Sequence, residues 1–210
     1  MNQIFNIFLD AYTNTSTKDI ILEVLAFIFG IASVIYAKRE NILVYPTGLV
    51  ATVITVYLLY KAQYFGDMTM NFYYSVMSLY GWWNWTRKKE SKNFLPISTT
   101  STQEKLIGVA LFIITMFVTF LVYKAYNYSL EIPNYIDIFT SGIFFTAMWY
   151  MATKKLANWT LWIIADLITV PLYAYRGLGV LSVQYLIFTI LATQGYLQWK
   201  KSLDSNQQIA

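Results

Sequence analysis

Apolar residues in this chain gather into long runs, separated by short segments that hold most of the charged side chains. A helix rises 1.5 Å per residue, so about 20 mostly apolar residues are needed to cross the hydrocarbon layer of a membrane. We therefore predict an all-α polytopic membrane protein whose residues 1–210 form a single domain. Seven segments are predicted transmembrane helices: Asp19–Ala37, Ile42–Tyr60, Phe65–Trp85, Leu106–Tyr126, Tyr135–Met151, Asn158–Tyr175 and Leu178–Trp199.

An internal repeat relates the first three predicted helices to the last three. The fragment ATVITVYL at Ala51–Leu58 resembles ADLITVPL at Ala165–Leu172, a shift of 114 residues (from 51 to 165). The same shift carries GWWNW, which begins at Gly81, onto GYLQW, which begins at Gly195. We predict a 3+1+3 arrangement, with repeat one at 19–85, a linker helix at 106–126 and repeat two at 135–199. Parallel repeats of this kind are typical of transporters whose substrate site lies between the two halves.

Lysines and arginines lie mainly on one side of the predicted membrane. Because basic residues concentrate in cytoplasmic loops, we predict an N-terminus outside the cell and a C-terminus in the cytoplasm. The more basic side holds eleven: Lys38, Arg39, Arg87, Lys88, Lys89, Lys92, Lys105, Lys154, Lys155, Lys200 and Lys201. The other side holds four: Lys18, Lys61, Lys124 and Arg176.

The N-terminal segment MNQIFNIFLDAY does not resemble a cleavable signal peptide, because it contains an acidic residue and its apolar run is short. We interpret it as a helix lying on the membrane surface, with a disordered segment as the alternative.

Composition supports a membrane protein and removes several kinds of chemistry. Hydrophobic residues make up 57% of the chain and charged residues 12%, against the roughly 25% charged residues of soluble domains. The chain has no cysteine and no histidine, which excludes disulfides, thiolate nucleophiles, imidazole catalysis and the usual zinc sites. We predict that the protein is not an enzyme and has no catalytic residue, metal, cofactor or nucleic-acid partner. A lipid-modifying enzyme would need the residue types that are missing, and a mere scaffold would not need buried polar groups.

Polar and aromatic residues recur along one face of the sixth predicted helix, at Trp159, Trp162, Asp166, Thr169 and Tyr173. An ionised carboxylate at the bilayer centre costs about 2.5–3.5 kcal/mol on insertion scales, so Asp166 is expected to face protein or water. Tryptophan faces attract cations. This face therefore predicts a pocket for a flat, positively charged ligand that forms hydrogen bonds.

Two other predicted helices carry polar residues at membrane depth. The third has a stripe of Asp67, Asn71, Tyr74, Ser78 and Trp82, and the seventh contains Gln184. A proton- or sodium-coupled transporter usually needs paired carboxylates, and the sequence offers Asp166 no obvious partner. Facilitated diffusion without coupling (uniport) is therefore favoured.

Each of these residues also has a simpler interpretation. Trp83, Trp85 and Trp199 adjoin basic segments, where tryptophan usually belongs to the interfacial belt, and we assign them to that belt. Trp159 fits the belt and the pocket equally well. Asp166 could instead be a structural partner of a serine or threonine hydroxyl, and the acidic residues Glu23, Asp67 and Asp137 are expected at the outer interface.

The third helix, FGDMTMNFYYSVMSLYGWWNW, resembles a characteristic segment of the nicotinamide riboside transporter family called PnuC, and so does the stretch NWTLW at the start of the sixth helix. The resemblance extends from the first predicted helix to Trp199. It implies a fold related to the SWEET sugar transporters and a homotrimer in the bacterial inner (plasma) membrane. It also implies uptake of a cationic vitamin precursor by facilitated diffusion, followed by phosphorylation by a cytoplasmic kinase that traps the product.

The resemblance also suggests which residues bind the substrate. The family's stacking tryptophans correspond to Trp159 and Trp162, and its polar contacts on the third helix correspond to Asn71 and Tyr74; we expect Asn158, Asp166 and Gln184 to join them. Nicotinamide riboside is the expected substrate. Thiamine, another flat-ringed cation carried by transporters of this shape, is the alternative.

Overall fold

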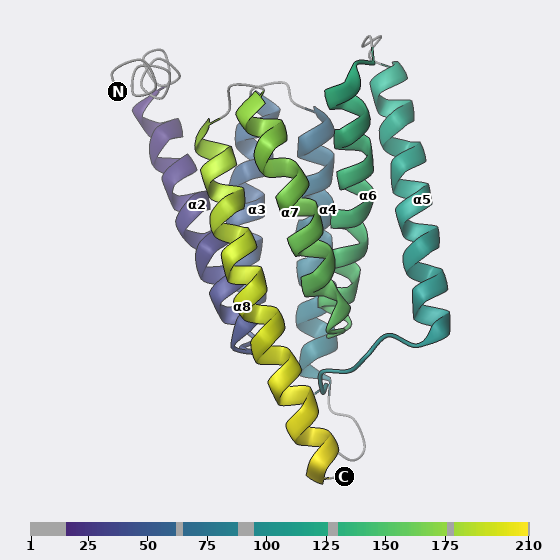
Figure 1. Ribbon diagram of the computed structural model, residues 1–210. Coiled ribbons are helices and arrows are strands. Elements are labelled where there is room, and N and C mark those ends of the chain that lie inside the picture. The colour runs from purple at the N-terminus through teal and green to yellow at the C-terminus, as the bar shows by residue number, and fades with distance from the viewer. Residues whose placement is uncertain (1–15, 62–64, 88–94, 126–129, 176–178, 210) are drawn as a thin grey trace.

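The computed structural model describes residues 16–61, 65–87, 95–125, 130–175 and 179–209, and in them the predicted seven helices are present. The N-terminal segment that we interpreted as a surface helix lies outside the described residues. The helices are α2 (Thr17–Lys38), α3 (Val44–Lys61), α4 (Phe65–Thr86), α5 (Thr102–Ala125), α6 (Ile132–Ala152), α7 (Ala157–Tyr175) and α8 (Gly179–Ile209) (Figure 1).

The largest difference from the predicted boundaries lies in α8, which continues past Trp199 to Ile209. The residues after Trp199 are mostly polar and include neither glycine nor proline. A loss of apolar character ends a membrane span but does not end a helix, which is why the hydropathy pattern stops short of the helix terminus.

Six of the helices form a closed ring. Neighbours along the chain pack together within each half, α2 with α3 and α3 with α4, then α6 with α7 and α7 with α8. The ring is closed by contacts of α4 with α6 and of α2 with α8. The 114-residue shift carries α2, α3 and α4 onto α6, α7 and α8, so these two closing contacts are equivalent to each other. The remaining helix, α5, packs on α6 outside this ring (Figure 1).

The outer surface is strongly apolar. On α5, Leu106 is 67% exposed, Phe117 60% and Ile114 58%. Such a helix would be insoluble in water but is well placed against lipid. Among the described helices, α2, α3 and α5 are long and apolar enough to span a membrane by hydropathy alone. The other helices carry more tryptophan, tyrosine, amide and hydroxyl side chains, which lowers their hydropathy.

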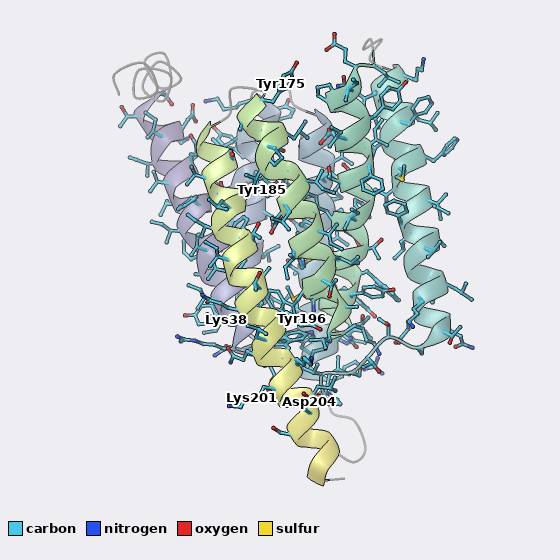
Figure 2. The ribbon with its side chains drawn as sticks, in the orientation of Figure 1. Lys38, Tyr175, Tyr185, Tyr196, Lys201 and Asp204 are labelled. Carbon is cyan, nitrogen blue, oxygen red and sulfur yellow. The ribbon has the colours of Figure 1, made fainter. Side chains whose placement is uncertain are left out.

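One end of the bundle is basic, and we call it the basic end. There α2, α4 and α6 finish and α5 begins, bringing together Lys38, Arg87, Lys105, Lys154 and Lys155. Figure 2 shows Lys38 and Lys201 toward this end and Tyr175 at the opposite end. The separation of charge along the bundle agrees with the asymmetry read from the sequence.

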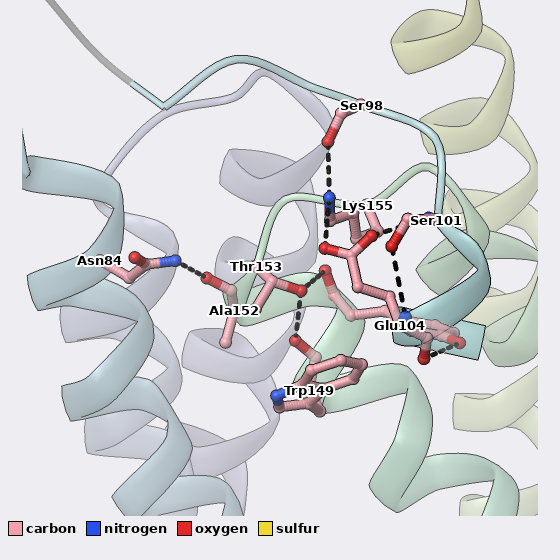
Figure 3. A network of polar contacts seen from close by, with 9 residues as sticks. Asn84, Ser98, Ser101, Glu104, Trp149, Ala152, Thr153 and Lys155 are labelled. Atoms are coloured by element: carbon pink, nitrogen blue, oxygen red, sulfur yellow. Dashed lines mark hydrogen bonds and ion pairs between the residues drawn. The ribbon is translucent and has the colours of Figure 1, made fainter. Parts of the chain in front are cut away.

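The linker before α5 lies across the basic end. Ser98 donates its backbone N–H to the carbonyl of Lys154 at 3.2 Å and accepts from the N–H of Leu156 at 3.0 Å. The Lys155 ammonium contacts Glu104 at 2.7 Å and donates to the Ser98 hydroxyl at 3.0 Å (Figure 3). The linker and the start of α5 are therefore fastened to the turn between α6 and α7.

Each half of the ring contains the same aromatic arrangement at the basic end. Tyr45 meets Trp85 edge to face with ring centroids 5.1 Å apart, and Trp159 meets Trp199 in the same way at 5.5 Å. The 114-residue shift relates the two pairs. Trp85 is only 4% exposed and Trp199 is fully buried. Our assignment of these two tryptophans to the interfacial belt is therefore wrong, whereas Trp83, 55% exposed, fits it.

A glycine in each half makes room for this aromatic pair. A Cβ atom added at Gly195 would lie 2.7 Å from the Trp159 ring, and one at Gly81 would lie 2.3 Å from the Tyr45 ring. We expect Gly195→Ala to lower the melting temperature by roughly 2–10 °C, because overpacking costs about 1–3 kcal/mol. Gly30→Ala, whose added carbon would be 3.9 Å from Phe188, is the matched control and should melt like the parent. Thermal unfolding of the purified protein in detergent measures both, and equal melting temperatures would contradict the tight contact.

Candidate functional site

The predicted polar face of α7 turns toward the inside of the bundle. Trp159, Asp166 and Thr169 are buried, and Trp162 and Tyr173 are half-buried. Asp166 lies at the midpoint of α7, as far from either end of the helix as a residue can be. The spacing of three and four residues therefore identified the inward face correctly.

Trp162 lies in a group of rings from four helices, which we call the aromatic cluster: Tyr74 on α4, Phe144 on α6, Trp162 on α7 and Tyr185 on α8. The centroid of the Trp162 ring is 5.4 Å from Phe144 and 6.2 Å from Tyr74. Phe144 is in turn 5.9 Å from Tyr185. In all three pairs the two ring planes are tilted relative to each other rather than stacked. Both halves of the ring of helices contribute to the cluster.

Asp166 lies one turn of α7 from Trp162 and is 2% exposed. Among the described residues, the structure records no hydrogen bond or ion pair to its carboxylate. The threonine hydroxyls on α7 and α8 donate to backbone carbonyls and not to this carboxylate: Thr169 donates to Ala165 at 2.8 Å and Thr189 to Tyr185 at 2.9 Å. Ionised carboxylates are expensive to bury unless they are paired, so the charged form of Asp166 would require a partner other than the described protein groups.

The equivalent position in the first half is occupied by Thr52, and it behaves differently. The Ser75 hydroxyl donates to the Thr52 hydroxyl at 2.8 Å, and Thr52 donates to the carbonyl of Leu49 at 3.2 Å. The first half thus satisfies its own polar groups at this level. Within the described residues, the second half places a buried acidic group there and the first half does not, which makes the interior asymmetric.

A second polar atom in the same region also lacks a partner. The indole Nε1 of Trp162 is buried and makes no hydrogen bond within the described residues. Buried polar groups are nearly always hydrogen-bonded, so each exception needs an explanation. Together, the Trp162 N–H and the Asp166 carboxyl group offer one donor and one acceptor to a ligand lying against the rings.

The other predicted site residues fall into two groups. Asn71 is half-buried on α4, one turn from Tyr74, and Gln184 is half-buried on α8 beside Tyr185, so both lie near the aromatic cluster along their helices. Asn158 and Trp159 lie instead at the basic end. There Asn158 is fully buried and donates its side-chain N–H to the carbonyl of Lys155 at 2.6 Å.

The aromatic cluster includes two rings that sequence reasoning missed. Phe144 and Tyr185 sit in ordinary apolar stretches, IFFTAMWY and VQYLIF, where aromatic residues are common in any membrane helix. Tyr185 had one signal in the sequence, its position directly after Gln184, and Phe144 had none. In the described part of the chain, no three acidic side chains gather in a way that would hold a metal ion.

Comparison with known proteins agrees with this architecture. The model of the nicotinamide mononucleotide transporter family matches residues 20–201. The nicotinamide riboside transporter PnuC of Escherichia coli (strain K12) is 22% identical over 204 residues, covering 86% of this chain and 85% of that protein, and the Shigella flexneri protein of the same name gives the same values. A crystal structure of the vitamin B3 transporter PnuC matches with a TM-score of 0.71 at 20% identity, over 95% of this chain and 88% of that one.

Proposed function

This chain belongs to the nicotinamide mononucleotide transporter family, and from that premise we propose that it takes up nicotinamide riboside by facilitated diffusion. Membership confirms the resemblance seen in the third and sixth helices. It also makes the protein a multi-pass membrane transporter and not an enzyme. The substrate and the residues that bind it are our proposal, supported by the geometry of the aromatic cluster and Asp166.

The observation that carries the proposal is the buried carboxyl group of Asp166, for which the described residues provide no recorded partner, one helical turn from Trp162 of the aromatic cluster. A permanent cation that enters this region gives the carboxylate the partner it otherwise lacks. A flat cation can in addition lie against the Trp162 ring, where the attraction is worth up to about 2 kcal/mol in a desolvated site. Nicotinamide riboside has both properties, because its pyridinium ring is planar and permanently charged.

The polar parts of the same substrate match the remaining groups. Its amide and ribose hydroxyls can accept from the Trp162 indole N–H and exchange hydrogen bonds with Asn71, Tyr74 and Gln184. We keep Trp159 and Asn158 in the proposed site. They lie at the basic end of the bundle, next to the path by which substrate would leave.

The number of buried acids supports the uniport part of the proposal. Asp166 is the single buried acidic residue in the described part of the chain, whereas an ion-coupled transporter usually has paired carboxylates at that depth. We place the basic end in the cytoplasm of a bacterial cell, because positive residues favour that side of the inner membrane. A kinase there would phosphorylate the nucleoside, and the product, which carries a phosphate group, could not return. We also propose that the protein assembles as a homotrimer.

Calorimetric titration of the purified protein with three ligands tests the substrate. We expect nicotinamide riboside to bind at least about tenfold more tightly than its uncharged dihydro form, because only the oxidised ring pairs with Asp166; that factor corresponds to about 1.4 kcal/mol. Thiamine is the third ligand. If thiamine binds more tightly than nicotinamide riboside, the chain is a thiamine transporter, and if neither binds, the proposed site is wrong.

A further inference from the structure

Two tryptophans at the basic end cross from one half of the ring to the other. The Trp85 indole N–H donates to the carbonyl of Met151 at 3.1 Å, and the Trp199 indole N–H donates to the carbonyl of Ala37 at 2.9 Å. The 114-residue shift relates Trp85 to Trp199 and Ala37 to Met151. These are therefore one contact made twice, once in each direction, between an indole on α4 or α8 and the last turn of a helix in the opposite half.

The carbonyls that accept these bonds lie in the last turns of α2 and α6. Each of them also accepts a backbone N–H, Ala37 from Glu40 at 3.1 Å and Met151 from Lys154 at 3.0 Å, so each helix end keeps a backbone hydrogen bond if the indole moves away. The two indole rings themselves lie side by side, with centroids 5.9 Å apart. The contact is thus buried on both sides.

An ion pair links two equivalent positions beside these tryptophans. Glu40 and Lys154 are related by the same shift, and each has a positive φ, 54° and 58°. The Lys154 ammonium is 3.1 Å from the Glu40 carboxylate and its side chain is 8% exposed. It also lies 4.7 Å from the centre of the Trp85 ring. Ion pair and indoles therefore form one connected unit, which we call the latch: Glu40, Trp85, Lys154 and Trp199.

The latch joins the halves, whereas the other aromatic contacts at this end lie within them. Tyr45 with Trp85 and Trp159 with Trp199 each belong to one half, so they would survive a rotation of the halves as rigid bodies. Two further polar contacts between the halves lie at the same end: Asn84 donates to the carbonyl of Ala152 at 2.9 Å, and Lys38 donates to Gln194 at 2.8 Å. Farther along α4, Tyr73 donates to the carbonyl of Phe145 at 3.1 Å.

We infer that the latch is the gate at the basic end, and that it must break each time the protein releases a molecule on that side. The inference rests on the proposed function, in which a substrate leaves the aromatic cluster toward the basic end. In this arrangement, which we take as closed, the buried indoles and the ion pair occupy the proposed exit path of the substrate at the basic end. Opening separates the halves, exposes the four residues to water and leaves each half internally intact.

The absence of native cysteine makes the movement directly measurable. Arg87 and Lys201 are exposed, lie at the basic end of opposite halves and are themselves related by the 114-residue shift. Spin labels on cysteines introduced at these two positions report the distance across the gate by pulsed electron paramagnetic resonance. The protein is reconstituted in lipid without substrate for this measurement.

Charge exchange at the ion pair tests the latch. We expect Glu40→Lys and Lys154→Glu each to increase the fraction of long label distances about fivefold, the effect of losing an interaction of roughly 1 kcal/mol. The double exchange should return the fraction toward the parent value, because both positions have the same backbone conformation and the opposite charges face each other again. Lys105→Glu, the same charge change at an exposed position of the basic end, is the control and should change nothing. Unaltered distances in both single variants would overturn the latch.

A second variant keeps the test decisive if a single charge reversal prevents folding. The combined change of Trp85→Phe and Trp199→Phe removes both indole N–H donors and retains two buried rings. We expect it to raise the long-distance fraction as well, with a melting transition still present; an unchanged distribution would again argue against the latch.

Titration of the same proteins with nicotinamide riboside separates the two proposals. Distances that respond in a protein that binds no nicotinamide riboside would leave the latch standing and remove the substrate, and the reverse result would remove only the latch.

Discussion

Replacing Trp162 with alanine will weaken the binding of nicotinamide riboside by about a hundredfold or more. Stacking of a nucleobase-like ring on an aromatic side chain contributes roughly 1–3 kcal/mol, and a desolvated cation–π contact adds up to about 2 kcal/mol. Each 1.4 kcal/mol is a factor of ten in affinity. Calorimetry on the purified variant, with its elution profile and melting temperature compared with the parent, measures the loss in a protein known to be folded.

Two further variants show whether the loss belongs to the ring in that place. Trp162→Phe retains an aromatic face at the same depth and should recover part of the affinity. Trp83→Ala removes an exposed tryptophan beside the basic end, which contacts no member of the aromatic cluster in the described structure, and should bind like the parent. Full affinity in Trp162→Ala would remove this residue from the proposed site.

Replacing Asp166 with asparagine will distinguish charged from uncharged ligands. We expect the affinity for nicotinamide riboside to fall by about 10–100-fold, the effect of losing a charge-assisted contact of about 1.5–3 kcal/mol. The affinity for the uncharged dihydro form should change by less than about threefold, because that ligand never paired with the carboxylate. The ratio of the two affinities, measured by titration on the same preparation, is the readout.

That ratio matters because asparagine also removes a buried acidic group that has no recorded partner among the described residues. The variant is therefore expected to be at least as stable as the parent, and a general loss of folding would lower both affinities together. Asp204→Asn, at an exposed position on the last turns of α8, is the control for removal of one carboxylate and should leave the ratio unchanged. Equal losses for both ligands would assign Asp166 a structural role.

Much of the architecture was predictable because lipid imposes a simple rule on sequence. Long apolar segments identified the helices, and a recurrence at three and four residues identified the inward face of α7, where Asp166 is indeed buried. The 114-residue repeat likewise anticipated which contacts would be equivalent. The predictions of the helices and of the inward face of α7 succeed because each depends on a property that a single helix displays by itself.

Contacts between helices were not predictable in the same way. Trp85 and Trp199 adjoin basic segments, which is where belt tryptophans occur, yet both are buried by a partner in the opposite half. Nothing in GWWNW distinguishes the exposed Trp83 from the buried Trp85 two residues on. Phe144 and Tyr185 were missed for the same reason, since their role arises only when four helices meet. Glu40 and Lys154 looked like ordinary loop charges until the fold placed them opposite each other.

The pairing of Glu40 with Lys154 says something about why both copies of the three-helix unit share one chain. In an assembly of two identical units, a residue on the axis meets its own twin, so an acid would face an acid and a base would face a base. Attraction at that point requires copies that differ. Fusion permits such divergence, provided that an odd helix such as α5 returns the chain to the starting side of the membrane, so that the second copy runs in the same sense as the first.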